Sequence, residues 1–153
     1  MDREKTDLKI LVSACLAGYR CRYDGKLKGD PRIERLVSSG IAVPVCPEVL
    51  GGLPVPRIPS EIQGERVVNA EGKDVTSEYH RGAEESLRIC RDNGCVLAVL
   101  KAKSPACGCG EVYDGTFSRT LIRGNGILAG MLEKEGVPVY TEQYIETVLK
   151  IIE

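Results

Sequence analysis

The sequence predicts an α/β fold of one domain, residues 1–153, arranged as a three-layer sandwich in which a mostly parallel sheet of about four strands is flanked by helices. Two observations support this prediction. The chain is long enough to form one hydrophobic core without disulfide bonds. Short apolar runs alternate with amphipathic helical patterns, and this alternation is typical of parallel strands joined by right-handed crossovers.

Four segments are predicted to be strands. Residues 9–13, 41–45 and 95–100 are apolar at nearly every position, as expected of parallel strands that are covered on both faces. Residues 137–140 form a shorter fourth run. Residues 1–7 carry mixed charges and are expected to be an N-terminal tail ahead of the first strand. These patterns do not determine the order of the strands in the sheet.

Four helical patterns lie between and after the strands. The first follows Pro31 and ends at Gly40. The second can be capped by Thr76 or Ser77 and ends at Gly94. The apolar positions of the other two are Ile127, Leu128, Met131 and Leu132, and Ile145, Val148, Leu149 and Ile152.

The segment between the second strand and the second helix, residues 46–72, is long and rich in Gly and Pro. A connection of this length in a compact domain is usually functional. We therefore expect residues 46–72 to be a long functional loop.

The composition excludes several classes of partner. Lys and Arg number 21 against 22 Asp and Glu, so the net charge of −1 gives no long-range attraction to polymeric nucleic acid or to an anionic membrane. No apolar stretch approaches the length of a membrane span. The seven cysteines are odd in number, and a domain of this size needs no disulfide framework. We expect a cytoplasmic protein whose thiols serve metal binding, catalysis or burial.

Three cysteines follow three different predicted strands. Cys15 follows the first strand, Cys46 follows the second, and Cys107 lies in the loop after the third. The carboxyl ends of parallel strands share one edge of the sheet, where ligands bind in a crevice, so we expect these thiols to meet there. Three converging thiolates can hold Zn²⁺ or an iron-sulfur cluster, and either leaves one coordination position open if no fourth protein ligand is present.

The remaining cysteines have different surroundings. Cys90 lies on an apolar helix face and Cys95 at the start of a strand, so both are expected to be small buried hydrophobes. Cys21 lies between two arginines, which favour its thiolate, and it can be a ligand, a sulfur acceptor or a support for its loop. Cys109 is close to Cys107 in sequence, and an exchange of ligand between the two stays open.

Two polar residues lie near these thiols in the sequence. Glu48 follows Cys46 and Pro47, and its carboxylate can act beside a metal as a general acid or base; the alternative is a solvated loop acid. Ser104 precedes Cys107 and can bond to a substrate or make a local turn. Glu48 and Ser104 are therefore the candidate catalytic residues.

These motifs together resemble the thiouracil desulfurase (desulfidase) family, long catalogued as a domain of unknown function. The resemblance extends from about Leu8 to Tyr140, and it depends on several motifs that occur in a fixed order. The motifs are SACLAGYRCRYDG, CPEVLGGLPVPR, GKDVTSEYHRGAE, KSPACGCGEVYDGTFS and GNGILAG.

The resemblance implies a [4Fe-4S] cluster with three protein ligands, Cys15, Cys46 and Cys107, and an open iron that acts as a Lewis acid. It also implies that Glu48 and Ser104 are the catalytic acid and serine. The implied reaction converts 2-thiouracil, or another small thiolated nucleobase, to uracil and sulfide without net redox change. Cluster-assembly or sulfur-acceptor proteins are the expected protein partners. The alternative is a non-catalytic module that binds zinc, a cluster or sulfide.

Overall fold

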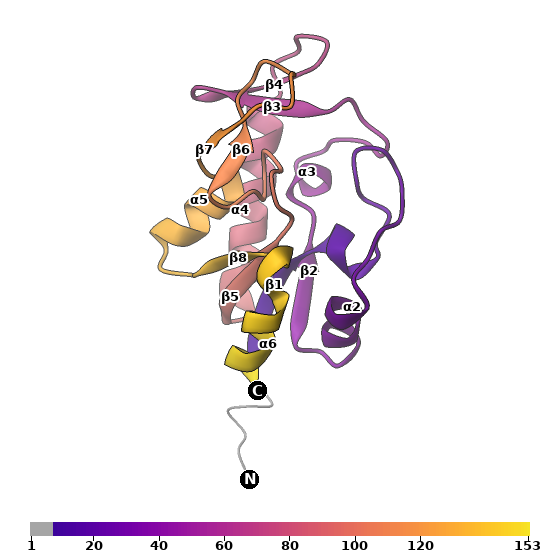
Figure 1. Ribbon diagram of the computed structural model, residues 1–153, viewed down its shortest axis with the longest axis vertical. Helices are drawn as coiled ribbons and strands as arrows, with labels where there is room; N and C mark the ends of the chain where they lie inside the picture. Colours follow the sequence, from indigo (N-terminus) through magenta and orange to yellow (C-terminus); the bar gives the residue numbers. More distant parts are fainter. Residues whose placement is uncertain (1–7) are drawn as a thin grey trace.

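The centre of the fold is a four-stranded parallel sheet with the strand order β2-β1-β5-β8 (Figure 1). The computed structural model describes residues 8–153, and the predicted tail, residues 1–7, lies outside the described residues. The strands are β1 (Lys9–Ser13), β2 (Ala42–Val45), β5 (Cys95–Leu100) and β8 (Val139–Thr141). The four predicted parallel strands are thus confirmed, with small differences at the ends of β2 and β8.

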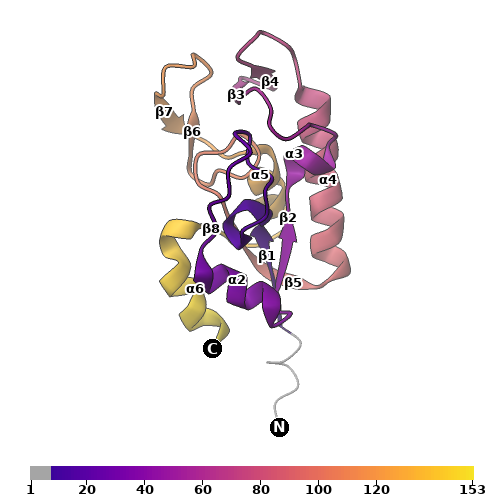
Figure 2. The ribbon, with the colours of Figure 1, turned by 90° about the vertical axis from the view of Figure 1, so that its right-hand side faces the viewer.

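Helices cover both faces of the sheet and confirm the predicted three layers (Figure 2). Their bounds are α2 (Pro31–Ser38), α4 (Thr76–Asp92), α5 (Ile127–Lys134) and α6 (Ile145–Ile152). α2 and α6 pack on one face, and α4 and α5 pack on the other. Side chains of β1 alternate between these faces, so that Ile10 and Val12 contact the first pair and Leu11 the second. Within residues 8–153, none of the helices is long and apolar enough to cross a membrane.

The order of the strands creates a crevice at the carboxyl edge of the sheet. The connection that leaves β1 leads to β2 on one side, whereas the connection that leaves β5 leads to β8 on the other. The two connections therefore leave in opposite directions from the neighbouring carboxyl ends of β1 and β5. Open α/β sheets bind their ligands at such a point. A short 3-10 helix, η1 (Ala14–Ala17), follows β1 directly at this edge.

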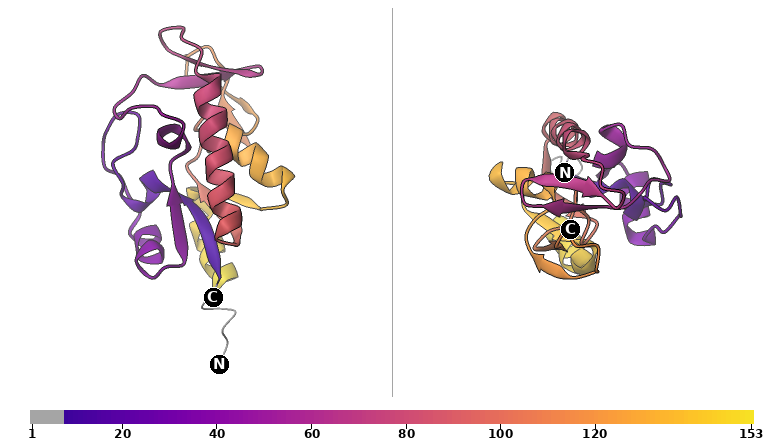
Figure 3. Two further views of the ribbon diagram at one scale, coloured as in Figure 1. Left: turned by 180° about the vertical axis from the view of Figure 1, so that it is seen from behind. Right: turned by 90° about the horizontal axis from the view of Figure 1, so that it is seen from above.

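Several short elements beyond this edge differ from the prediction (Figures 1 and 3). They are α3 (Pro47–Leu50), β3 (Ser60–Gln63), β4 (Arg66–Asn69), β6 (Glu111–Tyr113), β7 (Leu121–Arg123) and the 3-10 helix η2 (Glu142–Tyr144). The segment 46–72 is therefore not one irregular loop, because it contains α3 and the antiparallel hairpin β3–β4. The strands of the two hairpins are short and each contains charged or polar residues, so they leave no continuous apolar run in the sequence, and every residue of β7 is exposed.

The predicted N-terminal caps of α4, Thr76 or Ser77, were wrong. The backbone amide of Thr76 donates to Oδ1 of Asp74 at 2.9 Å, so Asp74 supplies the side chain that satisfies the start of the helix. The Thr76 hydroxyl instead accepts from the amide of Val67 in β4 at 2.9 Å. Because that hydroxyl connects the helix to the neighbouring hairpin, it is not available to cap the helix.

The helices α3 and α4 touch each other backbone to backbone. A Cβ atom added at Gly82 of α4 would lie 1.7 Å from the carbonyl oxygen of Pro47, and one added at Gly51 would lie 1.9 Å from the carbonyl oxygen of Glu78. Only glycine fits at these two positions, since any side chain would push the helices apart. This contact places α3 at the carboxyl edge of the sheet.

We predict that Gly82→Ala lowers the free energy of unfolding by about 2 kcal/mol or more, because the added methyl group forces α3 away from α4. Gly130→Ala is the matched control, since Gly130 is also helical and a Cβ there meets nothing closer than 3.9 Å. The control is expected to leave stability unchanged or raise it by up to about 1 kcal/mol. Urea denaturation followed by circular dichroism measures both. Equal stability of the two variants would contradict the proposed helix contact.

Candidate functional site

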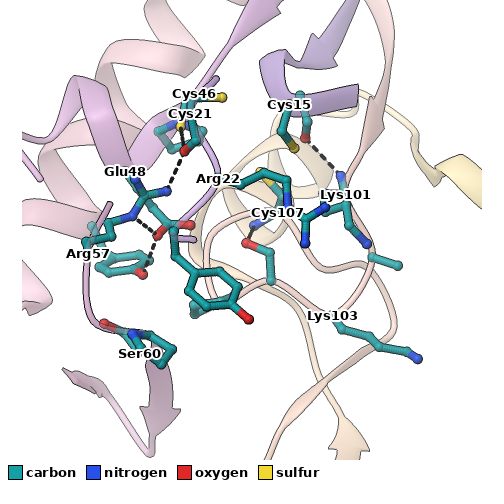
Figure 4. A pocket seen from close by; sticks show the side chains of 18 of the residues that line it. Cys15, Cys21, Arg22, Cys46, Glu48, Arg57, Ser60, Lys101, Lys103 and Cys107 are labelled. Carbon is teal, nitrogen blue, oxygen red and sulfur yellow. Dashed lines mark hydrogen bonds and ion pairs between the residues drawn. The ribbon is translucent and has the colours of Figure 1, made fainter. Parts of the chain in front are cut away.

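A cavity of about 510 Å³ lies at the carboxyl edge of the sheet, between the strand ends and the two hairpins. All five candidate residues from the sequence line this cavity: Cys15, Cys46, Glu48, Ser104 and Cys107. They come from three places in the chain, namely η1, the start of α3 and the loop after β5 (Figure 4). The structure therefore brings together residues that the sequence separates widely.

Cys21 lies in the cavity wall between two of these thiols. A hydrogen bond from the Cys21 thiol lowers the pKa of Cys15 and lowers the pKa of Cys46 to about 7. The pKa of Cys21 itself is raised, because its thiol hydrogen is shared with both neighbours. The expectation that the flanking arginines favour the Cys21 thiolate was therefore wrong. Cys21 thus contacts two candidate ligands, and its role as a ligand, a sulfur acceptor or a support for its loop stays a prediction.

Cys107 occupies the deepest position of the three candidate ligands. Burial raises the pKa of its thiol, and a hydrogen bond with the Ser13 hydroxyl opposes that shift. Ser13 is 3% exposed at the end of β1, and its Oγ accepts from the amide of Lys101 at 2.8 Å. Ser13 therefore joins β1, the loop after β5 and the buried thiol.

Ser104 organises the turn that carries Cys107. Its Oγ accepts from the backbone amides of Ala106 and Cys107, both at 3.1 Å. A hydroxyl has two acceptor positions and one hydrogen, so these bonds leave Ser104 only its hydrogen to donate into the cavity. The local turn considered from the sequence is thus present, and a contact with substrate stays a prediction.

Glu48 is held by two buried donors that both bind the same carboxylate oxygen (Figure 4). Oε1 accepts from Nε of Arg57 and from Oη of Tyr79, each at 2.8 Å. The Arg57 side chain is 6% exposed, and its Nη2 also donates to the carbonyl oxygen of Cys21 at 2.8 Å. Within residues 8–153, Oε2 of Glu48 has no hydrogen-bond partner. Glu48 is therefore a fixed and partly buried carboxylate, not a solvated loop acid.

Burial and the nearby Glu48 carboxylate raise the pKa of Tyr79, so its phenol remains protonated and donates at neutral pH. Neither Tyr79 nor Arg57 was singled out from the sequence, nor was Ser13. All three lie in the family motifs already quoted, Ser13 at the start of SACLAGYRCRYDG, Arg57 at the end of CPEVLGGLPVPR and Tyr79 in GKDVTSEYHRGAE. Those motifs are the signal that could have identified these residues.

The other three cysteines do not line the cavity. Cys90 and Cys95 are buried and hydrogen-bond to each other, and burial raises the pKa of both. Their predicted role as buried hydrophobes agrees with these positions. The Cys109 thiol donates to the carbonyl oxygen of Val139 at 3.5 Å, so the structure gives no support to an exchange of ligand with Cys107.

Cationic and aromatic side chains complete the cavity wall. The cations besides Arg57 are Arg22, Lys101, Lys103 and Arg119, and the aromatic residues are Tyr23, Tyr79, Tyr113 and Phe117. In the part of the chain that the structure describes, no group of three or more His, Cys, Asp or Glu side chains is arranged to hold a single metal ion.

Comparison with known proteins gives consistent results. A family model described as 2-thiouracil desulfurase matches residues 10–144. The uncharacterized protein YbbK of Bacillus subtilis (strain 168) is 39% identical over 150 residues, which cover 92% of this chain and 99% of YbbK.

A solved structure of the [4Fe-4S]-dependent thiouracil desulfidase TudS superposes with a TM-score of 0.90 at 43% sequence identity, covering 95% of this chain and 97% of TudS. The chain belongs to the 2-thiouracil desulfurase family.

Proposed function

We propose that this protein removes sulfur from 2-thiouracil or a closely related thiolated pyrimidine, and that it does so with a [4Fe-4S] cluster held by Cys15, Cys46 and Cys107. One observation supports this most strongly. Thiols from the ends of three different strands line the same cavity as a carboxylate that is fixed by Arg57. TudS, a [4Fe-4S]-dependent thiouracil desulfidase, shares the fold at 43% identity.

The residues present suit such a cofactor. Cys thiolates are the usual ligands of iron-sulfur clusters, and each binds a different iron, so the ligands surround the cluster and do not converge on a single point. The three thiols line a cavity of about 510 Å³, in which Cys21 and Ser13 supply hydrogen-bond donors to them. Donors of this kind orient metal ligands and tune the metal.

The overall reaction is a hydrolysis in which C=S and water give C=O and hydrogen sulfide, with no transfer of electrons. When bound, the cluster supplies an iron without a cysteine ligand as a Lewis acid for the soft thiocarbonyl sulfur. We assign Glu48 the role of general base, because Oε2 is free to take a proton from the attacking water. The same carboxyl group returns that proton to the sulfur, takes the second proton of the water as the C=O bond forms and the C–S bond breaks, and passes it to the departing sulfide, so that hydrogen sulfide leaves and the carboxylate is regenerated. The Ser104 hydroxyl donates a hydrogen bond to the pyrimidine ring.

We also infer a cytoplasmic location and a transient interaction with cluster-assembly or sulfur-acceptor proteins. All seven cysteines are free thiols, and free thiols persist in a reducing compartment. Cluster loading and sulfide removal are the steps at which such partners are needed.

The first test is the iron, acid-labile sulfide and zinc content of protein that has been purified or reconstituted without oxygen. About four iron and four sulfide per chain are expected, together with formation of uracil from 2-thiouracil. Zinc without a cluster after reconstitution, and no uracil, would support a non-catalytic zinc module instead.

We predict that Cys15→Ala, Cys46→Ala and Cys107→Ala each abolish cluster binding, because each removes one of three thiolates. Cys109→Ala is the control, since that thiol does not line the cavity. Iron analysis and the absorption spectrum after anaerobic reconstitution measure the effect. A full cluster in any of the first three variants would remove that cysteine from the ligand set.

Glu48→Gln is expected to keep the cluster and to lower kcat by about 10²–10⁴-fold, because the amide cannot take a proton from water. Single-turnover formation of uracil, normalised to the iron content, gives the comparison. Wild-type turnover in this variant would exclude Glu48 as the general base.

Tyr79→Phe is expected to lower kcat by about tenfold and to leave KM and the iron content unchanged, because it removes one of the two donors that orient Glu48. Tyr144→Phe makes the same exchange at a residue that is 56% exposed, and it should have no effect. A change in KM alone would point to a contact between Tyr79 and substrate.

A further inference from the structure

The turn between β6 and β7 brings two side chains to the cavity. Phe117 and Arg119 both line it, although their φ angles are 59° and 63°. Residues other than glycine seldom adopt this left-handed conformation, and they keep it only where surrounding contacts fix the backbone. The contacts of this turn therefore show how the two side chains are held.

Glu61 in β3 fixes the turn through a single carboxylate oxygen. The residue is 8% exposed, and its Oε1 accepts from the amide of Gly115 at 2.9 Å and from the amide of Phe117 at 3.1 Å. Nε2 of Gln63 donates to the carbonyl oxygen of Gly115 at 2.8 Å. The hairpin β3–β4 thus binds both the backbone amide and the backbone carbonyl of Gly115, and in this way it fixes the turn between β6 and β7.

The two hairpins also touch directly at this place. A Cβ atom at Gly115 would lie 2.7 Å from Cγ of Gln63 and 2.8 Å from the carbonyl oxygen of Ile62. Gly115 has a φ of 94°, so the close contact and the backbone conformation both require glycine. The turn therefore has little freedom to move the Phe117 side chain out of the cavity.

Phe117 differs from the other aromatic residues of the cavity. Tyr23, Tyr79 and Tyr113 each carry a hydroxyl, whereas Phe117 presents a wholly apolar ring. A flat apolar ring is suited to the face of a planar heterocycle, and base–aromatic stacking of this kind tolerates different substituents at the ring edge.

We propose that Phe117 is the surface on which the pyrimidine ring of the substrate stacks, and that Glu61 is a positioning residue that holds Phe117 in place. This inference rests on the proposed desulfuration and adds to it the recognition of the ring. Stacking does not involve the sulfur atom. It therefore contributes to the binding of both the thiolated substrate and uracil, the product.

The first test is Phe117→Leu, which keeps an apolar side chain but removes the flat ring. KM for 2-thiouracil and the inhibition constant of uracil should both rise by about tenfold, while kcat and iron content stay at the wild-type values. Phe117→Tyr keeps a flat aromatic ring, so both constants should stay near the wild-type values. Tyr144→Leu, an exchange of an aromatic residue outside the cavity, is the control.

The second test compares two variants of Glu61. Glu61→Ala removes both hydrogen bonds to the turn and should raise the same two constants as Phe117→Leu. Glu61→Gln retains an oxygen that can accept from both amides, so its constants should stay near the wild-type values. Glu65→Ala is the control, because Glu65 is exposed between the strands of the same hairpin.

Unchanged KM and uracil inhibition in Phe117→Leu would overturn the stacking proposal. Loss of kcat in Glu61→Gln would show that Glu61 transfers a proton, and would overturn its positioning role. Calorimetric binding of uracil to the cluster-loaded variants gives the same comparison without turnover. A wild-type chain that forms no uracil therefore contradicts the proposed reaction alone, and the stacking proposal is still tested.

Discussion

The candidate site depends on the contact between the backbones of α3 and α4. The carbonyl oxygen of Pro47 occupies the space that the Cβ atom of any larger residue at position 82 would need. Because Cys46 and Glu48 flank Pro47, this one contact fixes both a candidate ligand and the candidate base. Tyr79 lies about one turn before Gly82 on α4, and it reaches Glu48 only because the helices are this close. The separation of two helices thus sets the geometry of the reacting groups.

The irregular segments around the cavity are held by polar side chains that each accept more than one hydrogen bond. Ser104 accepts from two amides of the turn that carries Cys107. Oε1 of Glu61 does the same for the turn that carries Phe117, and Glu142 accepts from the amide of Ala102 and from Nζ of Lys101. Backbone groups that are not paired in helices or strands need such partners when they are buried. The loops consequently form a defined cavity without regular secondary structure.

The sequence predicted the parts of the fold that produce long, regular patterns. The apolar runs that became β1, β2 and β5 are buried on both faces, so their sequence carries a strong signal, and the topology of parallel strands then predicted where Cys15, Cys46 and Cys107 would lie. The hairpins β3–β4 and β6–β7 were missed because their strands are short and each contains charged or polar residues, so that none of them forms a continuous apolar run.

The partners of the predicted site residues were less accessible to sequence analysis. Arg57 and Tyr79 become neighbours of Glu48 only through tertiary packing, and nothing local to either residue indicates that contact. The position of Cys109 was open for the same reason. Its proximity to Cys107 in the sequence does not determine which side of the turn its thiol faces.

The order β2-β1-β5-β8 also bears on how the protein is assembled. β1 pairs with β5 across a large part of the chain, so the walls of the cavity do not exist until the C-terminal half of the sheet has joined the first strands. A cofactor that is held by Cys15, Cys46 and Cys107 together binds only the fully folded chain. Such binding stabilises the native state by mass action. Loss of the cofactor would then reduce the resistance of the whole sheet to unfolding, including strands far from the thiols.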